Sequence, residues 1–288
     1  MIREKLFGDC MDLMYDIPDK SINLILADLP FGTTKCKWDS IISLNDYVVY
    51  NNKKLTKDEF YLNMFLDNFN KEEIDYWWEE NMEIGLWSHY KRIIKDNGAI
   101  LLFAQTPFDK VLGESNLDML KYEWIWEKTS ATGHLNAKKM PMKAHENILV
   151  FYKKSPTYNP IKTTGHVRKV SSAKNRGACI DRRNQLDDYL YNKEYSDKVQ
   201  GYDSTERYPR SVITFKSDKQ KLSLHPTQKP VALLEYFINT YTNEGDIVLD
   251  NVAGSGSTGE ACENTNRQYY LMEKEEKYYN IILNRLNK

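Results

Sequence analysis

Long apolar runs and paired cysteines are both missing from this chain, and each absence excludes a class of protein. No apolar run approaches the roughly 18 residues that a membrane-spanning helix needs. Three of the first five residues, Arg3, Glu4 and Lys5, are charged, and no segment near them is apolar enough for a signal peptide. The four cysteines lie far apart and form no CxxC, which argues against a disulfide framework or zinc site. We therefore expect a cytoplasmic protein with free thiols, without a membrane span or a metal.

The chain also lacks an overall excess of either charge, because 40 Lys and Arg balance 41 Asp and Glu. The balance hides a local asymmetry. Between Lys153 and Lys221, 16 basic residues stand against 8 acidic ones, and this stretch has few apolar runs. A charged run is usually only a solvated face. Basic residues clustered on one surface can also neutralise phosphates, so this segment is a candidate for nucleic-acid contact.

Short apolar segments alternate with helical patterns over most of the 288 residues, which suit one large domain with insertions. The expected strands are Ile2–Phe7, Ile22–Ala27, Ala99–Ala104, Tyr122–Glu127, Asn147–Tyr152, Ile247–Asp250 and Gln268–Met272. The expected helices are Glu80–Ile94 with a stop at Gly98, Val231–Thr242 after Pro230, and Glu275–Leu286. This alternation predicts an α/β domain with a largely parallel, covered sheet.

Two stretches interrupt the alternation and are read as insertions. Residues 153–222 show neither a helical nor a strand period and predict an irregular basic subdomain. Trp38–Trp78 is the other insertion, helical in part, with Thr56 as a candidate cap for a helix over Lys57–Phe69.

A glycine-rich turn follows the expected strand that ends at Asp250. Gly254, Gly256 and Gly259 fit GxGxxG, which on its own also describes an ordinary tight turn. The strand before it, the helix after it and Glu273 at the end of the next strand favour a nucleotide site, since a carboxylate there can accept both ribose hydroxyls. A P-loop is excluded because no GK[ST] follows the glycines.

The position of this turn argues against a dinucleotide. Only 29 residues follow Gly259, too few for a second nucleotide-binding half. A carboxylate at Asp250 would repel a pyrophosphate but attract a cationic amino acid or sulfonium group. S-adenosylmethionine carries both kinds of positive centre.

Asp28-Leu29-Pro30-Phe31 stands at the end of another expected strand, where ligands bind in open α/β sheets. Pro30 fixes its own φ and disfavours helix at Leu29, so nearby carbonyls can face a cleft. An aspartate, a carbonyl and an aromatic ring make a cradle for an aromatic amine. The alternative is an ordinary strand exit with Phe31 buried.

Taken together, these motifs resemble the exocyclic-amino DNA methyltransferases in the arrangement where the catalytic motif precedes the cofactor motif. Asp28–Phe31 is similar to their Asp-Pro-Pro-Tyr, Asp250–Gly259 to their cofactor loop and His225–Pro230 to their H-P-T-x-K-P signature, while Gly8-Asp9 matches a further strand end. The resemblance covers residues 1–34, 92–152 and 223–288. Leu29 and Val252 depart from the usual proline and phenylalanine, and Val252 is expected to weaken cofactor binding.

The resemblance implies a Rossmann-like fold with a mostly parallel seven-stranded sheet, helices on both faces, a permuted motif order and an inserted target-recognition region. The implied domains are a catalytic half at 1–152, the basic recognition region at 153–222 and a cofactor half at 223–288. It also implies a base flipped out of duplex DNA and direct in-line methyl transfer from S-adenosylmethionine, with Phe31 stacked on the base and Asp28 and the Leu29 carbonyl holding its amino group. Asp28, Leu29, Pro30 and Phe31 form the expected catalytic set.

Two larger sets of residues follow from the same resemblance. The expected cofactor-binding residues are Asp9, Cys10, Asp28, His225, Thr227, Lys229, Asp250, Val252, Ala253, Gly254, Ser255, Gly256, Ser257, Thr258 and Glu273. The expected DNA-binding residues are Arg168, Lys169, Arg176, Arg182, Arg183, Arg207 and Arg210.

Within such a family an aspartate at position 28 favours adenine N6, whereas a serine there favours cytosine N4, which stays as the alternative. A cytosine C5 enzyme would need a Pro-Cys nucleophile, which the chain lacks. Methylation of RNA or of a protein glutamine, and a non-catalytic DNA-binding relic, are the rival functions. The expected partner is double-stranded DNA in the cytoplasm of a bacterium or of a phage host. A homodimer and a companion restriction endonuclease are compatible with this assignment.

Overall fold

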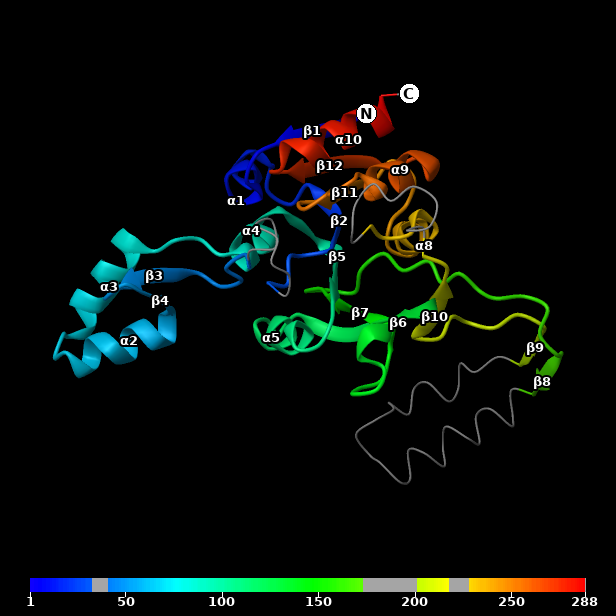
Figure 1. The fold of residues 1–288 in the computed structure, drawn as a ribbon, viewed down its shortest axis with the longest axis horizontal. Coiled ribbons are helices and arrows are strands. Elements are labelled where there is room, and N and C mark those ends of the chain that lie inside the picture. The colour runs from blue at the N-terminus through cyan, green and yellow to red at the C-terminus, as the bar shows by residue number, and fades with distance from the viewer. Residues whose placement is uncertain (33–40, 173–200, 218–227, 288) are drawn as a thin grey trace, which may run out of the picture. The chain divides into compact units, whose positions relative to one another are not determined.

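The computed structural model describes residues 1–32, 41–172, 201–217 and 228–287. Within the described residues, eight strands form one sheet in the order β1-β12-β11-β2-β5-β7-β6-β10 (Figure 1). The strands are β1 (Arg3–Phe7), β2 (Ile22–Ala27), β5 (Ile94–Ala104), β6 (Leu120–Thr132), β7 (Lys143–Phe151), β10 (Val212–Phe215), β11 (Ile247–Asp250) and β12 (Gln268–Glu273). Only β7 runs antiparallel to its neighbours among these strands. The predicted fold class is confirmed.

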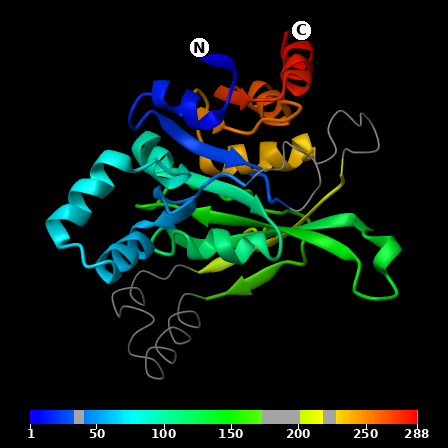
Figure 2. The same ribbon diagram turned by 60° about the vertical axis from the view of Figure 1, so that its left-hand side comes forward.

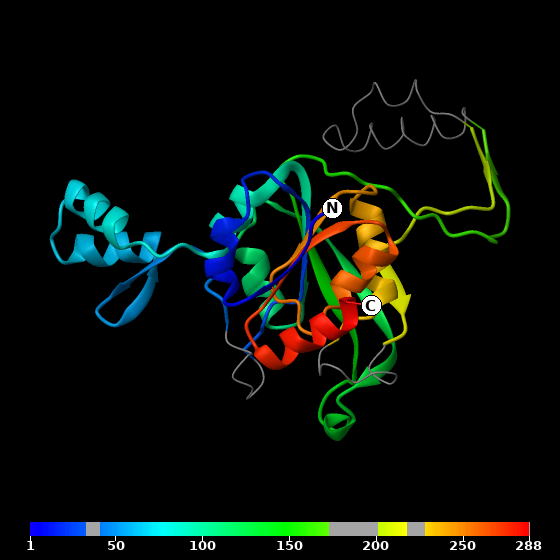
Figure 3. The same cartoon turned by 90° about the horizontal axis from the view of Figure 1, so that it is seen from above.

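Helices cover both faces of the sheet, as Figure 3 shows. On one face lie α1 (Cys10–Leu13), α4 (Leu86–Ile93) and α5 (Phe108–Glu114); on the other lie α8 (Val231–Tyr241), α9 (Ser257–Asn264) and α10 (Glu276–Leu286). Strand β2 shows why both faces need cover. Ile25 and Ala27 point into the first core, Leu24 and Leu26 point into the second, and all four are buried. Side chains alternate along a strand, so an apolar strand buries both of its faces.

The order of strands creates a crevice between β2 and β11. These two strands are parallel neighbours, with Val248 opposite Leu24. From β11 the chain moves to β12 on one side, whereas from β2 it moves to β5 on the other. The loops that follow β2 and β11 therefore diverge at the same edge of the sheet, which is where open α/β sheets bind ligands.

The insertion after β2 forms a small packed layer of its own. It contains β3 (Tyr47–Tyr50), β4 (Lys53–Thr56), α2 (Lys57–Leu66) and α3 (Lys71–Asn81) around buried Val48, Phe60, Met64, Ile74 and Trp78. Thr56 is the N-cap of α2, as predicted, and its N–H donates to the Glu59 carboxylate at 2.9 Å. The helix ends at Leu66, three residues earlier than predicted, because the chain turns at Asn68 with φ of 67°.

Two sequence expectations were wrong at the level of single elements. The helix predicted over Glu80–Ile94 begins only at Leu86, and Gly98 is not its stop but part of β5. A Cβ at Gly98 would lie 2.8 Å from the Ile94 side chain, so the glycine permits close packing within the strand. Val212–Phe215 was expected to be irregular, yet it forms β10 beside β6.

Residues Pro160–Arg210 form a second compact unit, separate from 1–159 and 211–288. Its described part contains β8 (Lys169–Ser171) and β9 (Tyr202–Ser204), which pair antiparallel. Among the described residues of the whole chain, no helix is both long and apolar enough to cross a membrane.

Candidate active site

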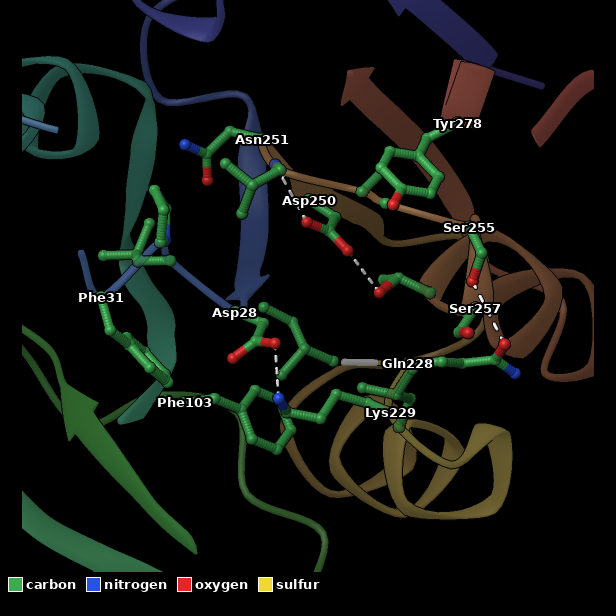
Figure 4. A pocket seen from close by; sticks show the side chains of 18 of the residues that line it. Asp28, Phe31, Phe103, Gln228, Lys229, Asp250, Asn251, Ser255, Ser257 and Tyr278 are labelled. Atoms are coloured by element: carbon green, nitrogen blue, oxygen red, sulfur yellow. Dashed lines mark hydrogen bonds and ion pairs between the residues drawn. The ribbon is translucent and has the colours of Figure 1, made fainter. Parts of the chain in front are cut away.

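A cavity of about 360 Å³ opens between the ends of β2 and β11 (Figure 4). Most of the predicted site residues line it together. From the two predicted sets these are Asp9, Cys10, Asp28, Leu29, Pro30, Phe31, Lys229, Asp250, Val252, Ala253, Gly254, Ser255, Ser257, Thr258 and Glu273. Gly256 shapes the turn without lining the cavity. His225 and Thr227 lie outside the described residues.

The glycine-rich turn is held by two buried carboxylates. Asp250 accepts the Val252 N–H at 3.1 Å and the Thr258 hydroxyl at 2.5 Å. Glu273 accepts the Gly254 N–H at 2.9 Å. Gly254 has a positive φ of 52°, a conformation that side chains disfavour. The turn is therefore fixed before any ligand arrives, and its carboxylates face the cavity.

The charges of the cavity suit a cationic ligand. Burial raises the pKa of Asp250 to about 7, against the lowering effect of its hydrogen bonds to Thr258 and Val252, while Asp28 and Glu273 raise it further. Burial likewise raises the pKa of Glu273, although hydrogen bonds from three backbone N–H groups partly offset it. A positive charge would stabilise both ionised carboxylates. The charges of these residues thus fit a cationic ligand such as S-adenosylmethionine.

Negative and positive side chains alternate in a row that starts at Asp28 and continues through Lys229 and Glu146 to Lys128. The Asp28 carboxylate accepts a 2.5 Å hydrogen bond from the Lys229 ammonium, which also lies 3.3 Å from Glu146 and 5.0 Å from the centre of the Phe103 ring. Lys128 contacts the other oxygen of Glu146 at 2.5 Å. Lys229 was predicted to bind the cofactor. In the structure its ammonium is directed at Asp28.

The protonation states in this row follow from the pairing. Burial would raise the pKa of Glu146, but Lys229 and Lys128 outweigh it and lower the pKa to about 2. Burial would lower the pKa of Lys229, but the Coulomb attraction of Asp28 and Glu146 holds it above the usual value. Lys229 is therefore a buried, permanent cation, and charged neighbours on both sides offset the cost of burying it.

Leu29 and Phe31, which follow Asp28 in the predicted motif, also border the cavity. The side chain of Leu29 is packed in the core at 2% exposure, so only its backbone is available to the cavity. Phe31 is half-buried, and its ring centre lies 5.1 Å from that of Phe108. A leucine in place of the usual proline is therefore compatible with the packing. The ring of Phe31 stands at the wall of the cavity.

Asn251 is a site residue that sequence reasoning missed. It follows Asp250, is buried, and accepts a 2.6 Å hydrogen bond from the Tyr90 hydroxyl. Its amide also contacts the Cys10 sulfur at 3.5 Å. Burial raises the pKa of the Cys10 thiol to about 11, so it is a neutral packing group at the cavity wall. Of the cysteines in the described part of the chain, Cys10 and Cys262 are both free and buried.

Lys128 and Glu146 were missed as well, because they belong to no motif. They stand on neighbouring strands, where Glu146 pairs with Trp126. One signal was available. Glu146 stands two residues before Ile148, at the start of the apolar run Ile148–Phe151, so the two side chains share one face of β7. A charged residue on a buried face needs a partner.

The predicted DNA-binding residues lie in the second unit. Arg168 forms a bidentate pair with Asp203 at 2.8 and 2.6 Å. Arg207 donates to backbone oxygens of Val167, Ser204 and Glu206, so its guanidinium holds the unit together. Lys169 and Arg210 are exposed. The expected Arg176, Arg182 and Arg183 lie outside the described residues.

No group of three or more His, Cys, Asp and Glu side chains within the described ranges is arranged to hold a metal ion.

Known proteins share both the sequence pattern and the fold. Residues 22–284 match the family model of N6/N4 DNA methylases. The DNA adenine methyltransferase YhdJ of Escherichia coli is 26% identical over 98% of this chain and 82% of its own length. The M1.HpyAVI–SAM complex superposes with a TM-score of 0.58 at 20% identity over both full chains. The cytosine-N4-specific PvuII DNA methyltransferase superposes with a TM-score of 0.57 at 16% identity, over 97% of this chain and 84% of that one.

The two solved structures share the fold, and one of them was determined with the predicted cofactor. The family match extends from the strand before the catalytic aspartate to the last helix. Since that match spans nearly the whole chain, the protein belongs to the N6/N4 DNA methylase family, the S-adenosylmethionine-dependent enzymes that methylate exocyclic amino groups of DNA bases.

Proposed function

We propose that this chain methylates the N6 amino group of adenine in duplex DNA. The observation that carries the proposal is the position of the Asp28 carboxylate. Asp28 directly follows β2, and it lines the same cavity as the glycine-rich turn that follows the neighbouring strand β11. A carboxylate accepts hydrogen bonds from an amino group more strongly than a hydroxyl does. Similarity to YhdJ, an adenine methyltransferase, supports the same choice.

The residues of the chain divide the work between holding the base and holding its amino group. Phe31 stacks on the face of the flipped base, and the Leu29 carbonyl and Asp28 accept the two amino hydrogens. These hydrogen bonds draw the nitrogen toward tetrahedral geometry and free its lone pair from the ring. S-adenosylmethionine, when bound, supplies a methyl group on a positively charged sulfur. Lys229 keeps Asp28 in place and ionised, so that the carboxylate acts as an acceptor.

The cofactor is held by the glycine-rich turn and the carboxylates around it. Glu273 retains oxygen lone pairs beyond those taken by backbone N–H groups, and these accept the ribose hydroxyls. Asp250 faces the sulfonium, and Asp9, which caps α1 by accepting the Met11 N–H at 2.9 Å, borders the adenine end. Val252 contributes less apolar contact than the phenylalanine it replaces.

The recognition of a DNA sequence belongs to the basic unit within 153–222 in this proposal. Its exposed Lys169 and Arg210 are free of the structural role that occupies Arg207. Basic residues of this kind neutralise phosphates, and some arginines read guanine edges. The site of action is then the cytoplasm, where the DNA of a bacterium or an infecting phage lies.

The test is methylation of DNA that lacks adenine and cytosine methylation, using purified protein and labelled S-adenosylmethionine. After digestion to nucleosides, we expect the label in N6-methyladenine. Asp28→Asn should lower the rate about a hundredfold or more, since an amide is a weaker acceptor. The matched Asp12→Asn change, on the exposed side of α1, should leave the rate unaltered.

Cytosine N4 is the second candidate, because the PvuII cytosine-N4 enzyme shares the fold. Label in N4-methylcytosine would keep the mechanism and replace the base. Binding of S-adenosylmethionine without any transfer to DNA would direct attention to RNA, and absence of both would favour a non-catalytic relic.

A further inference from the structure

The hairpin between β6 and β7 extends past the other strands, as the green ribbon in Figure 2 shows. The ladder closes with Thr132 opposite Lys143. Beyond that pair the chain turns through Gly133, with φ of 89°, and a single 3-10 turn at His134–Asn136. Every residue from 129 to 145 is exposed. The name hairpin tip is used here for residues 133–142.

The charge of this hairpin is of one sign. From 128 to 145 the sequence has four lysines and two histidines and no aspartate or glutamate. The contrast with the insertion after β2 is sharp, since residues 41–83 contain four lysines against ten acidic residues. A surface with cations alone attracts phosphates and repels other cations.

The hairpin tip also carries apolar side chains in open solvent. Leu135 is 87% exposed, Met140 is 59% exposed and Met142 is 41% exposed. Lys138 and Lys139 lie between them in the sequence, and exposed apolar groups gathered on one surface indicate a partner. Proteins that distort DNA insert leucine and methionine between base steps in this way.

The position of the hairpin relates the tip to the cavity. Ser130, Thr132 and Lys143 all line the cavity that holds Asp28, so the cavity wall continues up to the last pair of the ladder. Leu135 follows Thr132 by three residues, a reach of at most about 10 Å. That limit corresponds to about three steps of a DNA strand.

We propose that the hairpin tip enters duplex DNA next to the target base, with Leu135 filling the space that the flipped base leaves. Lys138 and Lys139 contact the adjacent phosphates. This inference rests on the proposed function and adds a DNA contact outside the basic unit. A protein partner is a weaker alternative, because it explains neither the single sign of charge nor the continuity with the cavity.

The charge part is tested by DNA binding alone, which needs no turnover. The Lys138→Ala/Lys139→Ala variant should bind duplex DNA more weakly than the wild type. Its slope of log affinity against log salt should be smaller by about two. Lys53→Ala/Lys54→Ala, in the insertion 41–83 that is acidic overall, is the matched control and should retain the wild-type slope. Equal slopes for all three proteins would overturn the proposal.

The wedge part is tested by pairing of the target base. Single-turnover methylation is measured on a duplex carrying the enzyme's own site and on the same duplex with the target base opposite an abasic position. Leu135→Ala should be slower by about tenfold or more on the paired duplex and close to wild type on the unpaired one, because the base there leaves the stack readily. Leu117→Ala removes a leucine that is 66% exposed outside the cavity and should match wild type on both.

The outcomes separate this inference from the proposed function. Equal loss on both duplexes, or no loss on either, would overturn the wedge while leaving methylation established. If the wild type transfers no methyl group to any DNA, the proposed function fails and the wedge at a target base fails with it. The salt slopes still decide whether the hairpin contacts DNA.

Discussion

At the residue scale, Asp250 combines two tasks that conflict at low pH. Its oxygens hold the glycine-rich turn, and in the proposed function its charge attracts the cofactor. Because burial places its pKa at about 7, a large share of free protein carries a proton on Asp250 at neutral pH. A cationic ligand favours the ionised form, so binding expels that proton.

Affinity for S-adenosylmethionine should therefore rise with pH through the range around 7. With a pKa of about 7, we expect binding about tenfold weaker at pH 6 than at pH 8. Titration calorimetry across this range checks the slope. S-adenosylhomocysteine, which lacks the sulfonium charge, should show a much flatter dependence, and a slope equal to that of the charged cofactor would assign the proton elsewhere.

Lys229 acts on the reaction through Asp28. Lys229→Met removes the cation from between Asp28 and Glu146, leaving two carboxylates facing one another. A positive charge close to a carboxyl group favours its ionised form. The acid limb of the pH–kcat profile should therefore move to higher pH. Lys128→Met, which touches Glu146 but not Asp28, should move it much less, and equal shifts would show that no specific pairing exists.

At the scale of elements, α9 lies close to the sheet because Gly259 has no side chain. A Cβ there would lie 2.5 Å from Leu286 and 2.7 Å from Leu271. Gly259→Ala should therefore lower the free energy of unfolding by about 1–2 kcal/mol, in spite of the better helix propensity of alanine. Chemical denaturation measures the change.

Gly113 provides the comparison. Its added Cβ would lie 3.5 Å from Leu120, an ordinary contact, so Gly113→Ala should be neutral or stabilise α5 by up to about 1 kcal/mol. Equal destabilisation of both variants would show that the close contacts of Gly259 with Leu286 and Leu271 are not the cause.

The strands that build the crevice could be predicted from the sequence because they are apolar and end in a motif. Ile22–Ala27 and Ile247–Asp250 were both placed to the residue. The boundaries of α4 could not be predicted. The helix expected from Glu80 begins within α3, and the glycine expected to end it, Gly98, lies within β5. Local propensity cannot separate a glycine that ends a helix from one that admits a neighbour.

The site was predictable where one segment carries it and not where distant strands meet. Asp28, Asp250 and Glu273 follow from strand ends. The partners of Lys229 do not, because Glu146 and Lys128 come together only through the register of β6 and β7. The β10 strand was missed for the same reason, since four residues with alternating exposure become a strand only beside β6.

At the scale of the whole molecule, the basic unit and the catalytic fold are separate bodies of contacts. Replacing Pro160–Arg210 with a flexible Gly/Ser linker should therefore leave affinity for S-adenosylmethionine within about twofold and preserve cooperative unfolding. Methylation of specific DNA should fall about a hundredfold or more, because the proposed recognition surface is gone. Unchanged rate and site preference would place recognition in the remaining fold.

The parallel pairing of β2 with β11 has a consequence for how the protein is made. Asn23 and Ile247 lie 224 positions apart and share a hydrogen bond of 3.1 Å. A nascent chain leaves the ribosome from its amino end, at about 5–20 residues per second. Asp28 therefore emerges well before the glycine-rich turn exists, and β2 must wait with one edge unpaired. The crevice closes only when synthesis has passed β11, so translation of all the residues up to Asp250 precedes the first complete crevice.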